Sequence, residues 1–360
     1  MIKLRAIVAA IAVCALTVSA HAAPPKGLDG ALRARAAAAG FDGAILVGYP
    51  DGSQQSFTVG AKPVRTTAVW RWASITKQLT AVIAMQEVAA GRLDLDAPVS
   101  RYWPEWKGPA AKQIRIRDLL MHRSGLPQPD ESAPDKDEVP SFYRRAAATP
   151  AISANGFCAG PQRAALPTDF NYNNCDSIVL AEVIARVTGK PFAVLLRERI
   201  ARPLGLRIFG LYQLGTVPFS HVRPTGEFAD KDPLLNMGVY GASGGAYGTI
   251  GDLWRFDHAL MKGKLVPAAQ RELMWQSTAD NGFYGFFQWI YPAPLADCAK
   301  PVRIVERQGL IGGIELRNYI LPETGRALIL FSRKRPTNLG DPWEGKGLAF
   351  DMLSKVACSK

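Results

Sequence analysis

Cysteine and histidine are scarce in this chain, which has five cysteines and four histidines among 360 residues. No two cysteines have the C-x-x-C spacing, and His122, His221 and His258 lie far apart in the sequence. Zinc sites are usually built from closely spaced cysteine and histidine ligands, so a zinc site is not expected. The chain also lacks internal repeats and a glycine-rich phosphate loop. We therefore expect neither a metal nor another cofactor.

The only long apolar run covers residues 6–18. It is shorter than the ~20 residues that a membrane-spanning helix needs. Lys3 and Arg5 precede it and Ala20-His21-Ala22 follows it, which is the pattern of a secretory signal peptide. Cys14 lies too far from the cleavage site to act as a lipid anchor. Residues 1–22 thus predict a periplasmic or secreted protein with no membrane span after their removal.

Basic residues outnumber acidic ones by 43 to 31, a formal net charge of +12, and loss of Lys3 and Arg5 with the leader leaves +10. A nucleic-acid-binding chain gathers such charge on one element or tail. Here the charge is dispersed, with short groups only at Arg144-Arg145, Arg197-Arg199-Arg202 and Arg333-Lys334-Arg335. We expect no nucleic-acid partner. A basic surface suits a compartment lined with anionic envelope polymers.

Four cysteines remain after the leader is removed: Cys158, Cys175, Cys298 and Cys358. An even number in an exported chain predicts disulfides. Of the three possible pairings we favour Cys158–Cys175, which closes a short loop, and Cys298–Cys358, which ties down the C-terminus.

Local patterns predict several elements in the first half. A helix over 31–39, capped by Asp29 and ended by Gly40, comes before a hairpin whose strands 44–47 and 55–59 flank Pro50-Asp51-Gly52-Ser53. A second helix starts at Ser74 and ends before Gly91. Further helices are expected over 116–121, over 177–187 with Asp176 as cap and Gly189 as stop, and over 191–200. Residues 127–169 are rich in proline and charge and have no sustained period. We expect this segment to form a wall or lid over a pocket.

The last third returns to strand character. Strands are expected over 284–291, 302–305, 314–321 and 327–331, with a turn at Pro322-Glu323-Thr324-Gly325 and a final helix over 347–356. Strands near both ends around a helical middle predict an α+β fold. We expect a sheet domain of 24–90 and 244–360, a mainly helical domain of 91–243, and an active site between them.

Ser74 and Lys77 form the most informative pair, because residues at i and i+3 share one helical face with Cβ atoms about 5–6 Å apart. The pair could be a nucleophile with its base. A helix N-terminus would also favour the negative charge of an alkoxide or oxyanion. The alternative is chance, because a chain of this length should contain about one Ser-x-x-Lys.

Two further groups could complete such a site. In Tyr172-Asn173-Asn174, the phenol could shuttle protons and the amide could hold Lys77 and a substrate carbonyl. The alternative is that this segment is only the turn that leads into a helix. Arg307-Gln308-Gly309 offers a cation, which could bind a substrate carboxylate or lower the pKa of Tyr172 and Lys77. The glycines of this region, beside the strand expected at Ile314, would permit close approach of a ligand. The alternative for this motif is a glycine-rich bend with a solvated arginine.

Ser243 needs separate treatment because Gly241-Ala242-Ser243-Gly244-Gly245 matches the G-x-S-x-G pattern. That motif requires a strand before it, a helix after it, and an acid and then a histidine downstream. His258 is the only downstream histidine and no βαβ pattern surrounds the site. We expect Ser243 not to be the nucleophile, and the three histidines to be structural or solvated.

In this order, the three motifs resemble the active site of the serine β-lactamase and penicillin-binding-protein superfamily. The likeness is greatest for its class C β-lactamase, D-alanyl-D-alanine carboxypeptidase and family VIII esterase branch. It extends over about 41–335, through the stretches 71–104, 116–127, 172–206 and 244–256. The resemblance implies a β-lactamase/transpeptidase-like fold, whose antiparallel sheet is built from both ends of the chain and flanked by helices.

The resemblance also implies a role for each site residue. These are Ser74 as acylated nucleophile, Lys77 as its activating partner, Tyr172 as shared acid and base, Asn174, Arg307, Gln308 and Gly309 as substrate-binding groups, and the backbone N–H groups of Ser74 and Leu310 as the oxyanion hole. Whether Lys77 or Tyr172 takes the first proton stays open. Relatives carry Lys-Thr-Gly or His-x-Gly in the third motif. This chain therefore lacks the threonine hydroxyl that assists β-lactam carboxylates.

The sequence thus predicts an exported serine hydrolase that cleaves an ester or amide bond of a small molecule or peptide through a Ser74 acyl-enzyme. Esterase or D-Ala-type peptidase ranks before β-lactamase. Two rivals from other classes are a penicillin-recognising protein that kept the fold and lost turnover, and a basic binder of envelope polymers.

Overall fold

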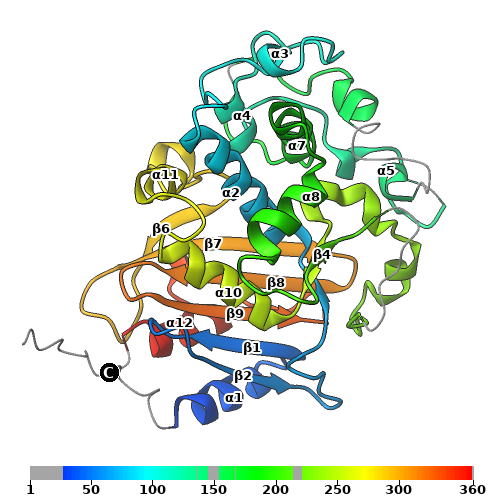
Figure 1. The fold of residues 1–360 in the computed structure, drawn as a ribbon. Coiled ribbons are helices and arrows are strands. Elements are labelled where there is room, and N and C mark those ends of the chain that lie inside the picture. Colours follow the sequence, from blue (N-terminus) through cyan, green and yellow to red (C-terminus); the bar gives the residue numbers. More distant parts are fainter. Residues whose placement is uncertain (1–26, 135, 145–153, 167, 214–220, 359–360) are drawn as a thin grey trace, which may run out of the picture.

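The computed structural model describes residues 27–134, 136–144, 154–166, 168–213 and 221–358. The expected leader lies outside these ranges. A six-stranded antiparallel sheet with the order β2-β1-β9-β8-β7-β6 forms the base of the molecule (Figure 1). Its strands are β1 (Gly43–Gly48), β2 (Gln54–Val59), β6 (Trp289–Ala293), β7 (Val302–Ile311), β8 (Ile314–Leu321) and β9 (Arg326–Ser332). Gly43 pairs with Ser332, so the two ends of the chain build one sheet, as expected.

Alternating side chains of the strands enter two separate cores. In β1, Ala44 and Leu46 face one core, and Ile45 and Val47 face the other. This follows from the two-residue period of a strand, because successive side chains point to opposite faces. Both faces are therefore apolar, and each must be covered by helices.

Helices α1 (Leu28–Ala38) and α12 (Leu348–Ala357) cover one face of the sheet, and α2 (Thr76–Ala89) and α10 (Ile250–Met261) lie on the other (Figure 1). Other α-helices in the described part of the chain are α3 (Val99–Tyr102), α4 (Ile116–Leu120), α5 (Ser141–Arg144), α7 (Cys175–Thr188), α8 (Phe192–Leu196), α9 (Gly241–Gly244) and α11 (Ala268–Met274). A small sheet of β3 (Trp70–Arg71), β5 (Ala246–Gly248) and β4 (Gly210–Leu211) lies beside α2. None of the described helices is long and apolar enough to cross a lipid bilayer.

Two expected helix caps are wrong. Asp29 lies inside the first turn of α1, whose N-cap is Gly27. Asp176 lies inside α7, which follows Asn174, and its carboxylate is fully buried. The expected glycine stops are confirmed, because Gly40, Gly91 and Gly189 all have φ between 66° and 69°, a left-handed conformation that glycine adopts without strain.

Two expected strands have different limits. The strand expected over 284–291 begins only at Trp289, because Phe283 and Phe287 have positive φ angles of 58° and 59° that interrupt an extended chain. The strand expected over 302–305 continues as β7 to Ile311 and therefore contains Arg307, Gln308 and Gly309. The third motif is part of the sheet and does not form a bend that enters a later strand.

The disulfides join Cys158 to Cys175 and Cys298 to Cys358, which is the pairing favoured from the sequence. The first connects the proline-rich segment to the start of α7. The second fixes the end of α12 to the loop after β6.

Candidate active site

Ser74 lies in a 3₁₀ turn, η1 (Ala73–Ile75), which runs directly into α2. The sequence predicted an α-helical start here, so the turn is tighter than expected. Ala73 precedes Ser74 with a φ of 47°, a conformation that non-glycine residues rarely adopt. Such strain often occurs at functional sites, where the surrounding structure enforces it. Lys77 follows on the same face, with Nζ 3.4 Å from Ser74 Oγ.

Tyr172 joins this pair from the loop before α7. Its phenol oxygen lies 2.7 Å from Ser74 Oγ and 2.7 Å from Lys77 Nζ. The tyrosine therefore links the serine and the lysine more closely than they approach each other. Tyr172, more than ninety residues away in the sequence, thus shares one hydrogen-bonded group with Ser74 and Lys77.

Lys77 is fully buried, and two oxygens besides those of Ser74 and Tyr172 contact its amine. Asn174 Oδ1 accepts a hydrogen bond from Nζ at 2.6 Å, and the carbonyl of Ser243 accepts one at 2.8 Å. Burial, and next the positive charge of Arg307, lower the pKa of Lys77 well below its usual range. These effects favour the neutral amine, which is the form that can accept a proton.

Arg307 is only 1% exposed, and each of its three nitrogens donates to the protein. Nε donates to the carbonyl of Ser74 at 2.8 Å, Nη1 to the Tyr284 hydroxyl at 3.1 Å, and Nη2 to the Tyr172 hydroxyl at 2.8 Å. Of the two roles considered for this cation, the geometry favours an effect on its neighbours over contact with a substrate carboxylate. Arg307 acts to lower the pKa of both Lys77 and Tyr172, as expected, but at Tyr172 burial is the larger effect and the pKa is raised.

Gly309 allows the β7 strand to pass directly beside the η1 turn that carries Ser74. A Cβ atom at this position would lie 2.7 Å from the Trp72 carbonyl and 3.3 Å from the Cβ atom of Ala73. The sequence predicted that the glycine would let a ligand come close to the strand; in the structure the backbone of the η1 turn lies close to it instead. Because β6 pairs with β7 only as far as Glu306, the following residues of β7 have a free edge toward η1. Leu310, 41% exposed, lies there in the same cavity as Ser74.

The cavity at this edge has a volume of about 570 Å³. Its lining includes the predicted site residues Ser74, Tyr172, Asn174, Arg307, Gln308 and Leu310. Asp130, Val139 and Tyr143 from the proline-rich segment form part of its wall, which agrees with the role expected for residues 127–169. In the described part of the chain, no group of three or more His, Cys, Asp or Glu side chains is arranged to hold a metal ion.

The hydroxyl of Ser243 is not available as a nucleophile. The residue is 1% exposed, and its Oγ donates a hydrogen bond to the Tyr240 carbonyl at 2.6 Å. His258 contacts the carbonyl of Pro50 in the β1–β2 hairpin. Ser243 contributes to the site through its backbone carbonyl, a contribution that its side-chain motif did not indicate.

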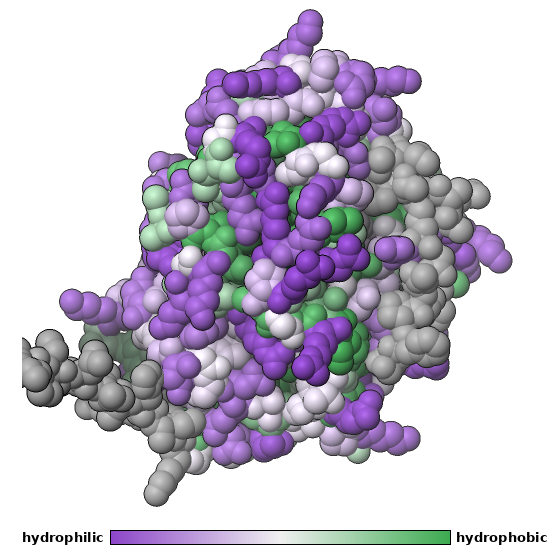
Figure 2. Space-filling model, viewed as in Figure 1, coloured by the Kyte–Doolittle hydropathy of each residue, from purple (hydrophilic) through white to green (hydrophobic). Residues whose placement is uncertain are grey.

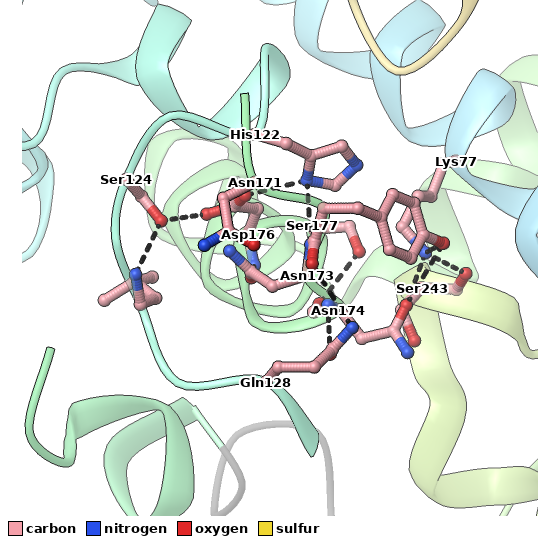
Figure 3. A network of polar contacts seen from close by, with 12 residues as sticks. Lys77, His122, Ser124, Gln128, Asn171, Asn173, Asn174, Asp176, Ser177 and Ser243 are labelled. Atoms are coloured by element: carbon pink, nitrogen blue, oxygen red, sulfur yellow. Dashed lines mark hydrogen bonds and ion pairs between the residues drawn. The ribbon is translucent and has the colours of Figure 1, made fainter. Parts of the chain in front are cut away.

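A buried polar network, shown in Figure 3, fixes the loop that carries Tyr172. The Asp176 carboxylate contacts His122 Nδ1 at 2.8 Å and accepts a hydrogen bond from the Ser124 hydroxyl. The His122 ring packs against the Tyr172 ring with centroids 4.5 Å apart. Burial lowers the pKa of His122 and raises that of Asp176, so both groups favour their neutral forms. The structural role expected for His122 thus includes direct support of the tyrosine.

Three residues near Asn174 were not indicated by the sequence. Gln128 Oε1 accepts a hydrogen bond from the Asn174 backbone, and Asp130 and Tyr143 contact its side-chain amide (Figure 3 shows Gln128 and Asn174). They come from a segment without a regular period, so no spacing pattern could single them out.

A sequence model of the beta-lactamase family matches residues 28–344. The chain belongs to this family of serine hydrolases. It is 31% identical over 162 residues to esterase EstB of Burkholderia gladioli, covering 41% of this chain and 40% of that protein. It is 28% identical over 196 residues to the D-alanyl-D-alanine-carboxypeptidase/endopeptidase AmpH of Escherichia coli K12, covering 52% and 48%. The chain thus spans about half the length of these relatives or less.

The fold is the β-lactamase/transpeptidase-like fold that the resemblance implied. The structure is similar to that of D-amino acid amidase from Ochrobactrum anthropi SV3, with a TM-score of 0.74 and 24% identity over 91% of this chain and 97% of the other. At that identity the likeness concerns the fold alone.

Proposed function

We propose that this protein hydrolyses an ester or amide bond through an acyl-enzyme on Ser74, as an esterase or a D-Ala-type peptidase. The observation that carries the proposal is the position of the Tyr172 hydroxyl, 2.7 Å from both Ser74 Oγ and Lys77 Nζ. A hydroxyl between a nucleophile and a buried amine provides a continuous path for the proton that must leave the serine.

The hydrogen bonds support one order of proton transfer. A neutral Lys77 has two N–H groups, and Asn174 Oδ1 and the Ser243 carbonyl can only accept them. The amine lone pair is then left for the Tyr172 hydroxyl. The tyrosine oxygen keeps two lone pairs, one for the Ser74 hydroxyl and one for Nη2 of Arg307. The relay therefore runs from Ser74 through Tyr172 to Lys77.

Acylation follows from this relay. Ser74 Oγ bonds to the substrate carbonyl carbon while its proton passes to the Tyr172 oxygen and the tyrosine proton passes to Lys77, which becomes charged. When the carbon–oxygen or carbon–nitrogen bond to the leaving group breaks, the leaving group takes a proton back by the same route. Water then attacks the acyl carbon and gives a proton to Lys77 through Tyr172. The bond from that carbon to Ser74 Oγ breaks, the proton returns to Ser74 Oγ by the same route, and the acid product leaves. Backbone N–H groups of Ser74 and Leu310 would stabilise the carbonyl oxyanion.

Arg307 supports an esterase or peptidase over a β-lactamase. Its nitrogens already contact Ser74, Tyr284 and Tyr172, so it does not present a free cation to a β-lactam carboxylate. EstB and AmpH carry the names of an esterase and a D-alanyl-D-alanine-carboxypeptidase, which fits this ranking.

Export is part of the proposal. Two disulfides are typical of proteins that fold in an oxidising compartment, and residues 1–22 have the pattern of a signal peptide.

Intact-protein mass spectrometry tests the proposal directly. The protein is exposed to a panel of p-nitrophenyl esters, D-Ala-D-Ala peptides and β-lactams, and peptide mapping locates any adduct. We expect a transient acyl adduct on Ser74 and none on Ser243, and loss of ester hydrolysis in Ser74→Ala. Ser53→Ala, in the exposed β1–β2 turn, is the control and should behave like the wild type. If Ser74→Ala left ester hydrolysis and fluorescent-penicillin labelling intact, the proposal would be refuted. Adducts that never turn over would favour the penicillin-recognising alternative.

A further inference from the structure

Asp130 places an exposed carboxylate in the wall of the cavity that contains Ser74. Within the described part of the chain, no lysine, arginine or histidine nitrogen forms an ion pair with this carboxylate. Its sequence neighbour Glu131, in contrast, pairs with Arg163 at 2.8 Å. The cavity thus contains a negative charge whose cationic partner is not supplied by these residues.

Three neutral groups hold the Asp130 carboxylate in place. The Tyr143 hydroxyl donates to Oδ1, Asn174 Nδ2 donates to Oδ1 at 3.2 Å, and Gln128 Nε2 donates to Oδ2 at 3.2 Å. Burial, and next the charge of Asp130, raise the pKa of Tyr143 well above its usual range, so it remains a donor. Neutral donors fix the orientation of a carboxylate without cancelling its charge.

Asn174 connects this carboxylate to the reacting groups. Its amide nitrogen contacts Asp130, and its amide oxygen accepts the hydrogen bond from Lys77 at 2.6 Å. Asp130 is therefore one side chain away from the Ser74–Tyr172–Lys77 group. A substrate whose carbonyl lies at Ser74 would bring groups close to that carbonyl within reach of this wall.

We infer that Asp130 binds a cationic amine of the substrate, and that the preferred substrates are esters or amides of amino acids with a free amino group. This inference rests on the proposed function and names its substrate class. The α-amino group, with a pKa of about 7.7–8.0, is largely cationic at neutral pH. An oriented, accessible carboxylate matches it in charge and in hydrogen-bonding geometry.

The test compares kcat/KM for D- and L-alanine methyl ester with kcat/KM for methyl propanoate, which lacks the amine. An ammonium group also activates an ester chemically, so the readout is the change of this ratio between variants. We expect Asp130→Asn to lower the ratio at least about tenfold for one enantiomer. Glu131→Gln removes an equal charge from the same turn, outside the cavity lining, and should keep the wild-type ratio.

A measurement on the wild type covers the case in which Asp130→Asn does not fold. Added NaCl should lower kcat/KM for the alanine ester, because salt screens the ion pair, and should leave that for methyl propanoate unchanged. An unchanged ratio in folded Asp130→Asn overturns the inference, as does an equal salt response of the two esters. Mass spectrometry of the protein after exposure to methyl propanoate, with peptide mapping of Ser74, separates the two proposals. An acyl adduct with an unchanged ratio refutes only the role of Asp130, and absence of acylation with every ester refutes the proposed function.

Discussion

Nη2 of Arg307 donates a hydrogen bond to the phenol oxygen of Tyr172 over 2.8 Å, from a side chain that is 1% exposed. The cation of the third motif would therefore act on the proposed proton relay from within the protein. Its charge stabilises negative charge on the tyrosine oxygen and opposes positive charge on Lys77.

Replacing Tyr172 by phenylalanine should abolish most of the activity. Without the hydroxyl, the remaining contact between Ser74 Oγ and Lys77 Nζ is 3.4 Å, which is long for proton transfer. We expect kcat to fall by about 10²–10⁴-fold, measured with a p-nitrophenyl ester. Tyr102→Phe, which removes a hydroxyl bound to the Asp94 backbone outside the cavity lining, is the matched control. Near-normal kcat in Tyr172→Phe would contradict the relay.

The pH dependence should move when Arg307 is replaced by glutamine. Lys77 acts as a base only when neutral, so kcat/KM falls as the pH drops through its folded pKa. Arg307 lowers that pKa, so its removal raises it and the acidic limb shifts to higher pH. Arg303→Gln, on the same strand but paired with Glu272 and Glu323, should keep the wild-type profile. A limb that stays in place or shifts to lower pH would argue against Lys77 as the final proton acceptor.

Gly309→Ala should damage both stability and activity. The new Cβ atom would lie 2.7 Å from the Trp72 carbonyl, so β7 and the η1 turn must move apart. Overpacking of this kind typically costs about 1–3 kcal/mol. Gly30→Ala, in α1 with no atom within 4 Å of the new Cβ, should stabilise the protein by about 0.5–1 kcal/mol. Urea unfolding and ester hydrolysis measure both effects, and an unaffected Gly309→Ala would show that the approach is not as close as described.

The two disulfides should differ in their effect on activity. Replacing Cys158 and Cys175 by serine opens a crosslink with a separation of 17 residues, at a cost of about 3 kcal/mol. It should also lower kcat/KM, because Cys175 directly follows Asn174. The pair Cys298–Cys358, with a separation of 60 residues, should cost about 4 kcal/mol and leave kcat/KM unchanged at temperatures where the protein is folded. Equal losses of kcat/KM in both double variants would contradict this difference.

Features set by neighbouring residues could be predicted from the sequence. The β1–β2 hairpin, the glycine stops and the proximity of Ser74 to Lys77 depend on residues a few positions apart, and the structure confirms them. The sheet built from both ends followed from the distribution of strands along the chain.

Features that depend on distant partners could not be predicted in the same way. From the sequence Asp176 was expected to cap a helix, and only the fold shows that it lies inside α7 and faces His122 and Ser124. The length of β7 was missed because a buried arginine interrupts its apolar pattern. Arg307 is tolerated there because Ser74, Tyr172 and Tyr284 accept its hydrogen bonds.

The pairing of Gly43 with Ser332 has a consequence for biosynthesis. A ribosome completes the Ser74 turn long before it reaches β7, the strand that carries Arg307 and lines the cavity. Long-range pairing of this kind forms late in folding. We therefore expect nascent and truncated chains that end before β7 to be inert, so that hydrolytic activity emerges only after the last strands have been translated and the sheet has closed.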